Sequence, residues 1–306
     1  RSIAGIINHK YNKKVGENIC RFGWVDFIDS QEVVSALLAK VEEYAREKMM
    51  DVVEGPVGFL EFDISGILVE GFDQVPTAYG KYNAPYYEPL ILAEGYVKET
   101  DFVEYRITVP DNIDRYTRFA ELVAGRQNLR EANCRSKKEL VRKYADGIFE
   151  VMNSCYSKIH GFSELSPAQC EDLKDQFLPN LNLDYVSVIL DRNDKVVGFG
   201  VTLPSLSLAL QKAKGHMFPF GFIHILKALR RTETIDALMI GVLPQYQGKG
   251  ASLLIFKYLL DSCRKYGVTR MYANPQLETN QKVQTVFDGL METHEFQRRR
   301  CYVRDL

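Results

Sequence analysis

The segment Ile235–Leu254 runs from an apolar strand through a glycine-containing turn into an apolar helix, with the sequence IDALMIGVLPQYQGKGASLL. Gly248 and Gly250 let the backbone bend and approach a ligand closely, because glycine has no Cβ. The first amides of the new helix have no partner within it, and they lie at the positive end of its dipole. A tight turn without a ligand has the same pattern. Because the strand, Pro244, the glycines and the helix follow in order, we favour pyrophosphate binding.

Two well-known phosphate motifs do not describe this turn. A Walker P-loop is excluded because no Gly-Lys-Ser/Thr follows the glycines. A dinucleotide-binding turn is excluded because the segment has neither Gly-x-Gly-x-x-Gly nor a βαβ unit with an acidic residue on the next strand.

The turn resembles motif A of the GCN5-related N-acetyltransferases (GNAT), Val-x-Pro-x-Tyr-[Arg/Gln]-Gly-x-Gly, which Val242–Gly250 matches as VLPQYQGKG. The core pattern [Gln/Arg]-x-x-Gly-x-[Gly/Ala] falls on Gln247, Gly250 and Ser252. Ser252 departs from Gly/Ala but is still small. A second register begins at Gln245, and the Val-x-Pro-x-Tyr lead-in favours the first.

The resemblance implies transfer of an acyl group from acyl-coenzyme A to an amine, with acetyl-coenzyme A as co-substrate. It implies that backbone groups of the motif strand bind the pantetheine arm, at Met239, Ile240, Gly241 and Val242. It also implies that the turn binds the pyrophosphate, at Gln247, Gly248, Lys249, Gly250, Ala251 and Ser252. Asn280, which opens a late helix in the family's order of elements, joins the cofactor-binding set.

We expect an α/β (or α+β) chain with a tandem GNAT-like fold, in which mixed central sheets are flanked by helices. The domains are residues 1–109, a degenerate GNAT-like copy, and residues 110–306, the coenzyme A-binding copy. The turn at Asp29–Ser35, which corresponds to the pyrophosphate loop in the first copy, has no glycine and two carboxylates. The whole chain also resembles a bacterial group of tandem acetyltransferase-like proteins, in the segments Gly55–Phe59, Leu68–Asp73 and Tyr82–Tyr96.

Periodicity predicts the elements of both copies. We expect a hairpin from Ser2–Asn8 and Cys20–Ile28, a loop at Glu54–Gln74 and a last strand at Cys301–Val303. The helices are expected at Gln31–Lys48, Asn83–Ala93, Arg115–Arg126, Lys137–Lys158, Pro167–Phe177, Ala251–Tyr266 and Gln281–Leu290.

Acyl transfer to an amine needs a base for the ammonium proton and an acid for the thiolate. The family's glutamate base corresponds to Asp236, which lies six residues before Val242; a solvated strand-start carboxylate is the alternative. The family's tyrosine acid corresponds to Phe287, which has no proton to give. Tyr272, Tyr246 or water could take its place, or the domain does not catalyse; we select Tyr272, because Tyr246 fits a packing role better. Glu278 is a further candidate, either as a reader of a cationic substrate or as a helix-start carboxylate.

Charge and cysteine spacing limit the partners. Lys and Arg number 39 against 40 Asp and Glu, a net charge of −1, whereas a nucleic-acid binder needs a basic surface. The six cysteines form no CxxC pair and have no histidine at ligand spacing, so we expect no metal and reduced thiols in a cytoplasmic protein. The expected acceptor is a small-molecule or peptide-like amine. An acyl-coenzyme A sensor and an aminoacyl-tRNA-dependent transferase are the alternatives.

Residues 204–232 form an apolar insert that we expect to be mostly helical. Packing between the two copies, a hydrophobic wall for the acceptor and a homodimer face are three accounts of it. Its uncharged stretch of 12 residues, Gly215–Leu226, is too short to span a membrane, and we expect no membrane partner. The chain starts at Arg1 in what reads as the middle of a strand, so we expect residues upstream of this numbering.

Overall fold

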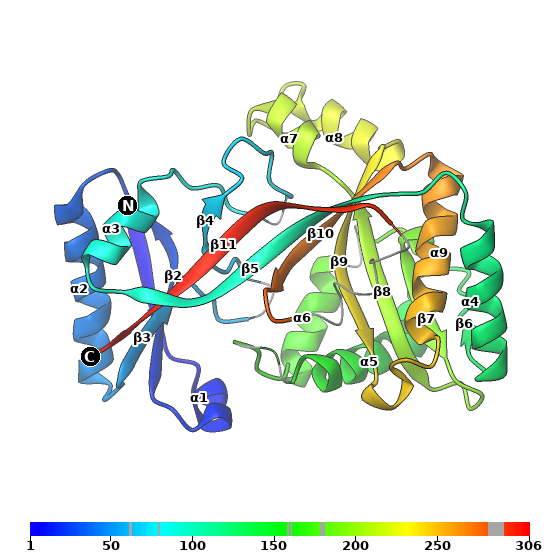
Figure 1. Ribbon diagram of the computed structural model, residues 1–306, viewed down its shortest axis with the longest axis horizontal. Helices are drawn as coiled ribbons and strands as arrows, with labels where there is room; N and C mark the ends of the chain where they lie inside the picture. The colour runs from blue at the N-terminus through cyan, green and yellow to red at the C-terminus, as the bar shows by residue number, and fades with distance from the viewer. Residues whose placement is uncertain (61–62, 79, 158, 160, 178–180, 281–290) are drawn as a thin grey trace.

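Figure 1 shows the computed structural model of the chain, which describes residues 1–60, 63–78, 80–157, 159, 161–177, 181–280 and 291–306. The strands are β1 (Ser2–Ile6), β2 (Ile19–Asp26), β3 (Val52–Gly55), β4 (Ile67–Glu70), β5 (Val97–Thr108), β6 (Arg130–Glu131), β7 (Val186–Leu190), β8 (Val196–Pro204), β9 (Thr234–Val242), β10 (Arg270–Leu277) and β11 (Thr293–Asp305). The helices are α1 (His9–Val15), α2 (Gln31–Glu47), α3 (Tyr87–Ala93), α4 (Asp114–Arg126), α5 (Lys137–Tyr156), α6 (Pro167–Phe177), α7 (Ser207–Ala213), α8 (Gly221–Arg230) and α9 (Ala251–Tyr266).

One continuous sheet joins both halves in the order β1-β2-β3-β11-β5-β10-β9-β8-β7-β6, and β4 pairs with β11 beside this path. Two of its pairs are parallel, β2 with β3 and β9 with β10, and each is connected through one helix, α2 or α9. A parallel pair requires such a crossover, so each half contains one strand–helix–strand unit. This arrangement confirms a mixed α/β fold of two similar copies.

The two halves exchange their strands at the centre of the sheet. β5, from the first half, lies against β10 of the second half, and β11, the last strand of the chain, lies between β3 and β5. In Figure 1 the red β11 runs from the second half across to the first, beside the cyan β5. Residues 1–109 and 110–306 thus share one ladder of hydrogen bonds, and their separation into domains stays a prediction.

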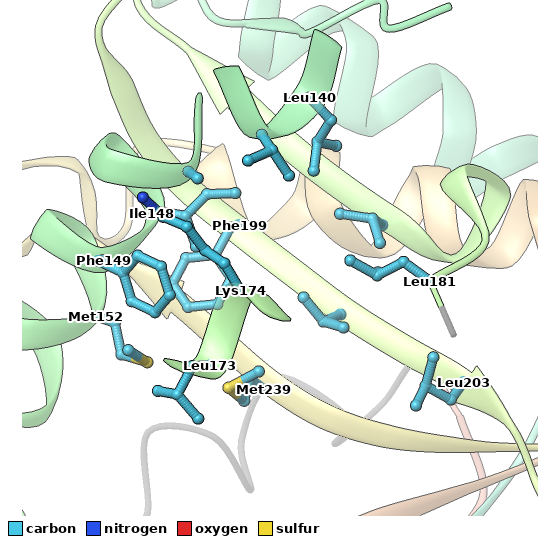
Figure 2. Close-up of a pocket in the computed structure, with 14 residues that line it drawn as sticks. Leu140, Ile148, Phe149, Met152, Leu173, Lys174, Leu181, Phe199, Leu203 and Met239 are labelled. Carbon is cyan, nitrogen blue, oxygen red and sulfur yellow. The ribbon is translucent and has the colours of Figure 1, made fainter. Parts of the chain in front are cut away.

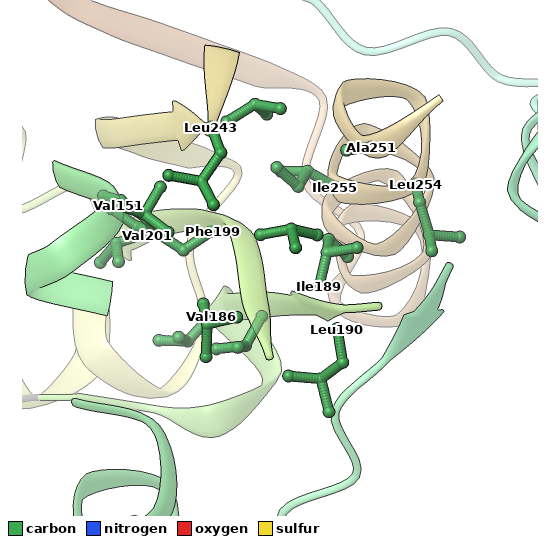
Figure 3. Packing of buried hydrophobic residues seen from close by; sticks show 14 of the residues in the cluster. Val151, Val186, Ile189, Leu190, Phe199, Val201, Leu243, Ala251, Leu254 and Ile255 are labelled. Atoms are coloured by element: carbon green, nitrogen blue, oxygen red, sulfur yellow. The ribbon is translucent and has the colours of Figure 1, made fainter. Parts of the chain in front are cut away.

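Helices cover both faces of the sheet in the second half. α9 lies against the face that carries Gly198 and Gly200, where a Cβ on Gly200 would be 2.5 Å from Ile255 Cγ2. α5 lies over the opposite face, toward which the side chains of Phe199 and Val201 of β8 point. Figure 3 shows the resulting core, in which Ile189 and Leu190 of β7 lie toward α9, and Phe199 and Val201 of β8 lie near Val151 of α5.

In the first half, one amphipathic helix packs on the sheet. The buried residues of α2 recur every three or four positions, which places them on one face of a helix. That face, formed by Val34, Leu38, Val41 and Ala45, packs into the core of β1, β2 and β3.

Several sequence expectations need correction. β1 and β2 pair antiparallel, but helix α1 connects them, so they do not form a simple hairpin. The expected loop 54–74 begins in β3 and contains β4, both of which are only four residues long and give little periodicity. The last strand extends from Thr293 to Asp305 because it pairs along its length with β5 and β3. The expected helix 281–290, with Phe287, lies outside the described residues.

Candidate active site

β9 and β10 are paired only over their first halves. The parallel ladder runs from Thr234 opposite Arg270 to Ala237 opposite Ala273 and then stops. The register of β9 against β8 shifts at the same point, which leaves Leu238 as an extra residue. The side-chain amide of Asn274 donates to the Leu238 carbonyl at 3.3 Å. Beyond this point β10 no longer pairs with β9, and side chains bind the β9 carbonyls instead: Tyr156 donates its hydroxyl to the Ile240 carbonyl at 3.0 Å.

A cavity of about 230 Å³ occupies this divergence. Its walls come from both halves and both faces of the sheet: β9 and β10 at the centre, α9 on one face, the loop at Asp63–Ser65 on the other, and Arg299 of β11. The loop belongs to the first copy, and no part of the sequence reasoning identified it.

Three residues that line this cavity each have one buried polar atom without a hydrogen-bond partner among the described residues. These atoms are Asn274 Oδ1, Gln276 Oε1 and Arg299 Nη2. An unsatisfied buried polar group costs about 1–3 kcal/mol, so such atoms indicate a place where a bound molecule completes the hydrogen bonds. Two acceptors and one cationic donor suit a ligand that carries both N–H or O–H groups and an oxygen.

Arg299 is held in place by a buried ion pair. Its Nε lies 2.7 Å from Glu104 Oε1, its Nη1 donates to the Lys81 carbonyl at 2.6 Å, and both charged side chains are at most 1% exposed. Burial raises the pKa of Glu104, and the charge of Arg299 acts in the opposite direction. Arg298 and Arg300 point to the other side and reach Asp101. The three consecutive arginines of β11 therefore point to alternating sides of the strand, and all three are paired with carboxylates of the chain.

Asp236 is 1% exposed, and its Oδ1 has no hydrogen-bond partner among the described residues. Burial raises the pKa of this carboxyl to about 7; a hydrogen bond with Ser205 opposes the rise and the Glu104 carboxylate adds to it. A carboxyl with a pKa near 7 is half ionised at neutral pH, so it is suited both to accept and to release a proton. The alternative prediction, that Asp236 is a solvent-exposed carboxylate at the start of a strand, is therefore wrong.

The other two catalytic candidates differ in their surroundings. Tyr272 is the register partner of Asp236 in the β9–β10 ladder, and its ring packs edge-on against Phe296 at 5.1 Å. Glu278 forms ion pairs with Lys98 at 2.9 Å and with Arg298 at 3.4 Å. Its charge is thus neutralised within the chain. None of the three candidates, Asp236, Tyr272 and Glu278, is among the residues that line the cavity, although Ala237 and Ala273, the next residues after Asp236 and Tyr272, are.

The glycine turn has the backbone geometry that its sequence predicts. Gly248 and Gly250 have φ of 71° and 94°, in the left-handed region that favours glycine. A Cβ on Gly250 would also lie 2.6 Å from Val123 Cγ1 of α4. α9 begins after Gly250 without a side-chain cap, so the amides of Ala251 and Ser252 remain for an external anion.

The predicted cofactor residues fall into two groups. Met239, Ile240 and Asn280 line the cavity, whereas Gly241 and Val242 of β9 and the turn at 247–252 lie beyond it. The Gln247 side chain donates to the Val242 carbonyl at 3.2 Å and so braces the turn against the strand. Tyr246 donates to Asp191 at 3.0 Å, which makes it a packing residue.

A second, apolar cavity of about 90 Å³ lies between the sheet and helices α5 and α6. Figure 2 shows its lining, in which Phe149 of α5 lies beside Phe199 of β8, Leu173 of α6 lies beside Met239 of β9, and Leu203 of β8 lies at the other end. Val201 and Met239 line both cavities, so the apolar cavity adjoins the first. Its lining residues are ordinary core types, and no sequence signal distinguishes them from packed core.

Comparison with known proteins agrees with this geometry. Residues 146–288 match the family model described as acetyltransferase (GNAT) family. The chain contains a GNAT-family domain. Proteins of this family are generally acyltransferases. The matched region includes β9, the glycine turn and α9, the elements that form the site.

Two curated relatives extend over nearly the whole chain. Protein YghO of Escherichia coli K12 is 24% identical over 312 residues, covering 99% of this chain and 78% of its own length. Bacterial ceramide synthase of Caulobacter vibrioides is 23% identical over 283 residues, covering 89% of this chain and 72% of its own. A solved GCN5-related N-acetyltransferase from Sphaerobacter thermophilus superposes with a TM-score of 0.51 at 9% identity, covering 99% of this chain and 76% of that structure.

The described residues provide neither a metal site nor a membrane-spanning helix. They contain no cluster of three or more His, Cys, Asp or Glu side chains arranged to hold a metal ion. Nor does any helix among them have the length and apolar character needed to cross a membrane.

Proposed function

We propose that this chain transfers an acyl group from acyl-coenzyme A to an amine. The observation that carries the proposal is the cavity at the divergence of β9 and β10, which is lined by Ala237, the residue that follows Asp236, a buried carboxyl with a pKa of about 7. Pantetheine would lie along residues 238–242 of β9, where β10 no longer pairs with the strand, and its pyrophosphate would meet the amides of Ala251 and Ser252. Coenzyme A thioesters are cytoplasmic, and the reaction is proposed for that compartment.

Asp236 is the proposed base. Its carboxylate removes a proton from the ammonium form of the acceptor, and the free amine then attacks the thioester carbonyl. The C–N bond forms, the C–S bond breaks, the nitrogen releases its second proton to solvent, and the coenzyme A thiolate takes up a proton. Tyr272 is the proposed donor of that proton, because it lies in register with Asp236 on the neighbouring strand.

The acceptor is proposed to be a small-molecule amine with further hydrogen-bonding groups. Arg299 Nη2 would donate to an oxygen of the acceptor, while Asn274 Oδ1 and Gln276 Oε1 would accept from its O–H or N–H groups. Because Glu104 already neutralises Arg299, a neutral hydroxyl suits this position better than a second carboxylate.

The apolar cavity is proposed to hold a hydrocarbon chain of one substrate. It shares Val201 and Met239 with the first cavity, where the acyl group would be transferred. The relative named bacterial ceramide synthase supports this proposal, since a ceramide is the amide of a long-chain amino alcohol and a fatty acid.

The test is turnover with a matrix of donors and acceptors. Acetyl-, octanoyl- and palmitoyl-coenzyme A would each be combined with an amino acid, a polyamine and a long-chain amino alcohol, with thiol release and amide mass as readouts. We expect an amide product, with the longer donors or the long-chain acceptor preferred. Tight acyl-coenzyme A binding without any product would contradict the proposal and favour the sensor alternative. Amide formation only with aminoacylated tRNA would favour the aminoacyl-tRNA-dependent transferase.

A further inference from the structure

The insert between β8 and β9 folds as a helical hairpin, α7 and α8, with an unusual surface. Its apolar side chains are exposed, with Phe218 at 77%, Phe220 at 70% and Leu208 at 55%. The remaining exposed ones are Leu210, Met217, Phe222, Ile223, Leu226 and Leu229. Packing between the two copies therefore does not describe them. So many exposed apolar side chains on one short hairpin indicate an interaction site.

The hairpin is also strongly basic. Residues 205–232 contain no Asp or Glu, and they contain five cationic side chains: Lys212, Lys214, Lys227, Arg230 and Arg231. All five are exposed, and none is in an ion pair with another residue that the structure describes. The chain as a whole is almost neutral, at −1, so this local charge is a property of the hairpin.

On α8 the exposed apolar side chains and the cationic side chains lie on different parts of the helix surface. Phe222, Leu226 and Leu229 are spaced by four and three residues, which places them on one face of the helix. Lys227 and Arg230 follow the apolar residues by one position and lie along the edge of that face. In Figure 1 the hairpin projects from the body of the molecule, above the ends of β8 and β9.

We propose that the α7–α8 hairpin docks on the surface of an anionic lipid bilayer. Exposed Phe and Leu side chains would enter the boundary between headgroups and acyl chains, and the cations beside them would meet lipid phosphates. This is surface binding and requires no membrane-spanning helix, and it replaces the expectation from the sequence that the chain has no membrane partner.

Charge favours a bilayer over a second copy of this chain. In a twofold homodimer the same patch meets itself, so the five cations of one hairpin would face the five cations of the other. No carboxylate within the hairpin would offset this repulsion. An anionic bilayer matches both the apolar and the cationic part of the surface.

The hairpin is attached directly to the proposed catalytic strands. Leu203, which lines the apolar cavity, is opposite Asp236 in the β8–β9 ladder, and Ser205 donates its amide to the Thr234 carbonyl at 3.0 Å. Docking would therefore hold the proposed acyl-transfer site near the bilayer surface.

The test is co-sedimentation of the full chain with vesicles of phosphatidylcholine alone or with 30% phosphatidylglycerol added (roughly the anionic fraction needed for a clear surface potential). We expect binding to the anionic vesicles that weakens as salt is raised. The paired variant Lys227→Glu/Arg230→Glu should weaken it by about tenfold or more, since each basic residue contributes near the surface. The paired variant Phe218→Ser/Phe220→Ser should weaken it as well.

Matched controls are Lys40→Glu/Lys143→Glu and Phe119→Ser, which change exposed residues outside the hairpin. These should bind vesicles as the parent does, and thermal unfolding should show that every variant is folded. Unchanged vesicle binding in both hairpin variants would overturn the proposal. So would absence of vesicle binding by the parent chain, or a dimer in light scattering that the hairpin variants abolish.

Discussion

Asp236 and Tyr272 lie opposite each other in the parallel ladder of β9 and β10, so their side chains leave the same face of the sheet. Leu203 is the partner of Asp236 on its other side, in β8. The proposed base therefore lies between an apolar cavity wall and a tyrosine, just before the point at which the two strands diverge. Low polarity around the carboxyl explains why burial is the largest cause of its raised pKa.

Asp236→Asn should reduce acyl transfer by about 10²–10⁴-fold at pH 7, because the base is lost, and acyl-coenzyme A affinity should stay close to that of the parent. The rate of the parent should rise with pH and level off above about 7, the pKa of the carboxyl. The variant should lack this step. Asp305→Asn, on the exposed end of β11, is the matched control. Equal rates in parent and Asp236→Asn would exclude Asp236 as the base.

The same residue should reduce stability as pH rises. The folded pKa of about 7 exceeds the model-compound value of 3.8, so between these two pH values the folded state binds the proton that the unfolded state has lost. The free energy of unfolding therefore falls as pH rises from about 4 to 7. Asp236→Asn should remove this fall, so the variant should melt above the parent at pH 8. A lower melting temperature for the variant at pH 8 would contradict the raised pKa.

Ser252→Asp should weaken acyl-coenzyme A binding while leaving the helix intact. The carboxylate would lie at the second position of α9, where it favours the helix dipole but repels a pyrophosphate. Calorimetry should show a loss of about tenfold or more in affinity, the order of one charge repulsion at close range. Ser252→Ala is the control and should bind normally. If Ser252→Asp binds as tightly as Ser252→Ala, the pyrophosphate lies elsewhere.

Ala145→Leu should shorten the chain that the enzyme prefers. Ala145 of α5 lines the apolar cavity of about 90 Å³, and the added methyl groups would occupy part of it. We expect kcat/KM for the long-chain substrate to fall by about tenfold, the order expected for lost contacts of two methylenes, with short-chain turnover unchanged. The matched control is Ala39→Leu, on the exposed face of α2. Loss of short- and long-chain turnover to the same degree would indicate general disruption instead.

A fragment of residues 1–109 should not fold, because β11 is missing from its place between β3 and β5. Fusing a copy of Thr293–Leu306 to the fragment through a flexible linker should restore cooperative unfolding by circular dichroism. Cooperative unfolding of the fragment without the added strand would show that the first copy is an independent domain, and would contradict the importance of the exchange.

The sequence by itself determined the elements whose stabilising interactions are local. The turn at Gly248 and Gly250 is specified by residues that tolerate positive φ, and α9 by apolar residues at helical spacing. Asp236 could be placed on the motif strand for the same reason, since a fixed number of residues separates it from Val242. The glycine turn, its helix and the candidate base were thus predictable.

Only the tertiary structure decided which distant residues meet. Arg299 reaches Glu104 because β11 pairs with β5, across nearly two hundred residues of chain, and local pattern carries no information about such a partner. The exchange of β5 and β11 depends on the free energy of the whole sheet, and the sequence of either strand would also suit pairing within its own half. The fate of the apolar insert was likewise decided by tertiary packing, since hydrophobicity alone favours burial equally well in a core, a dimer or a bilayer.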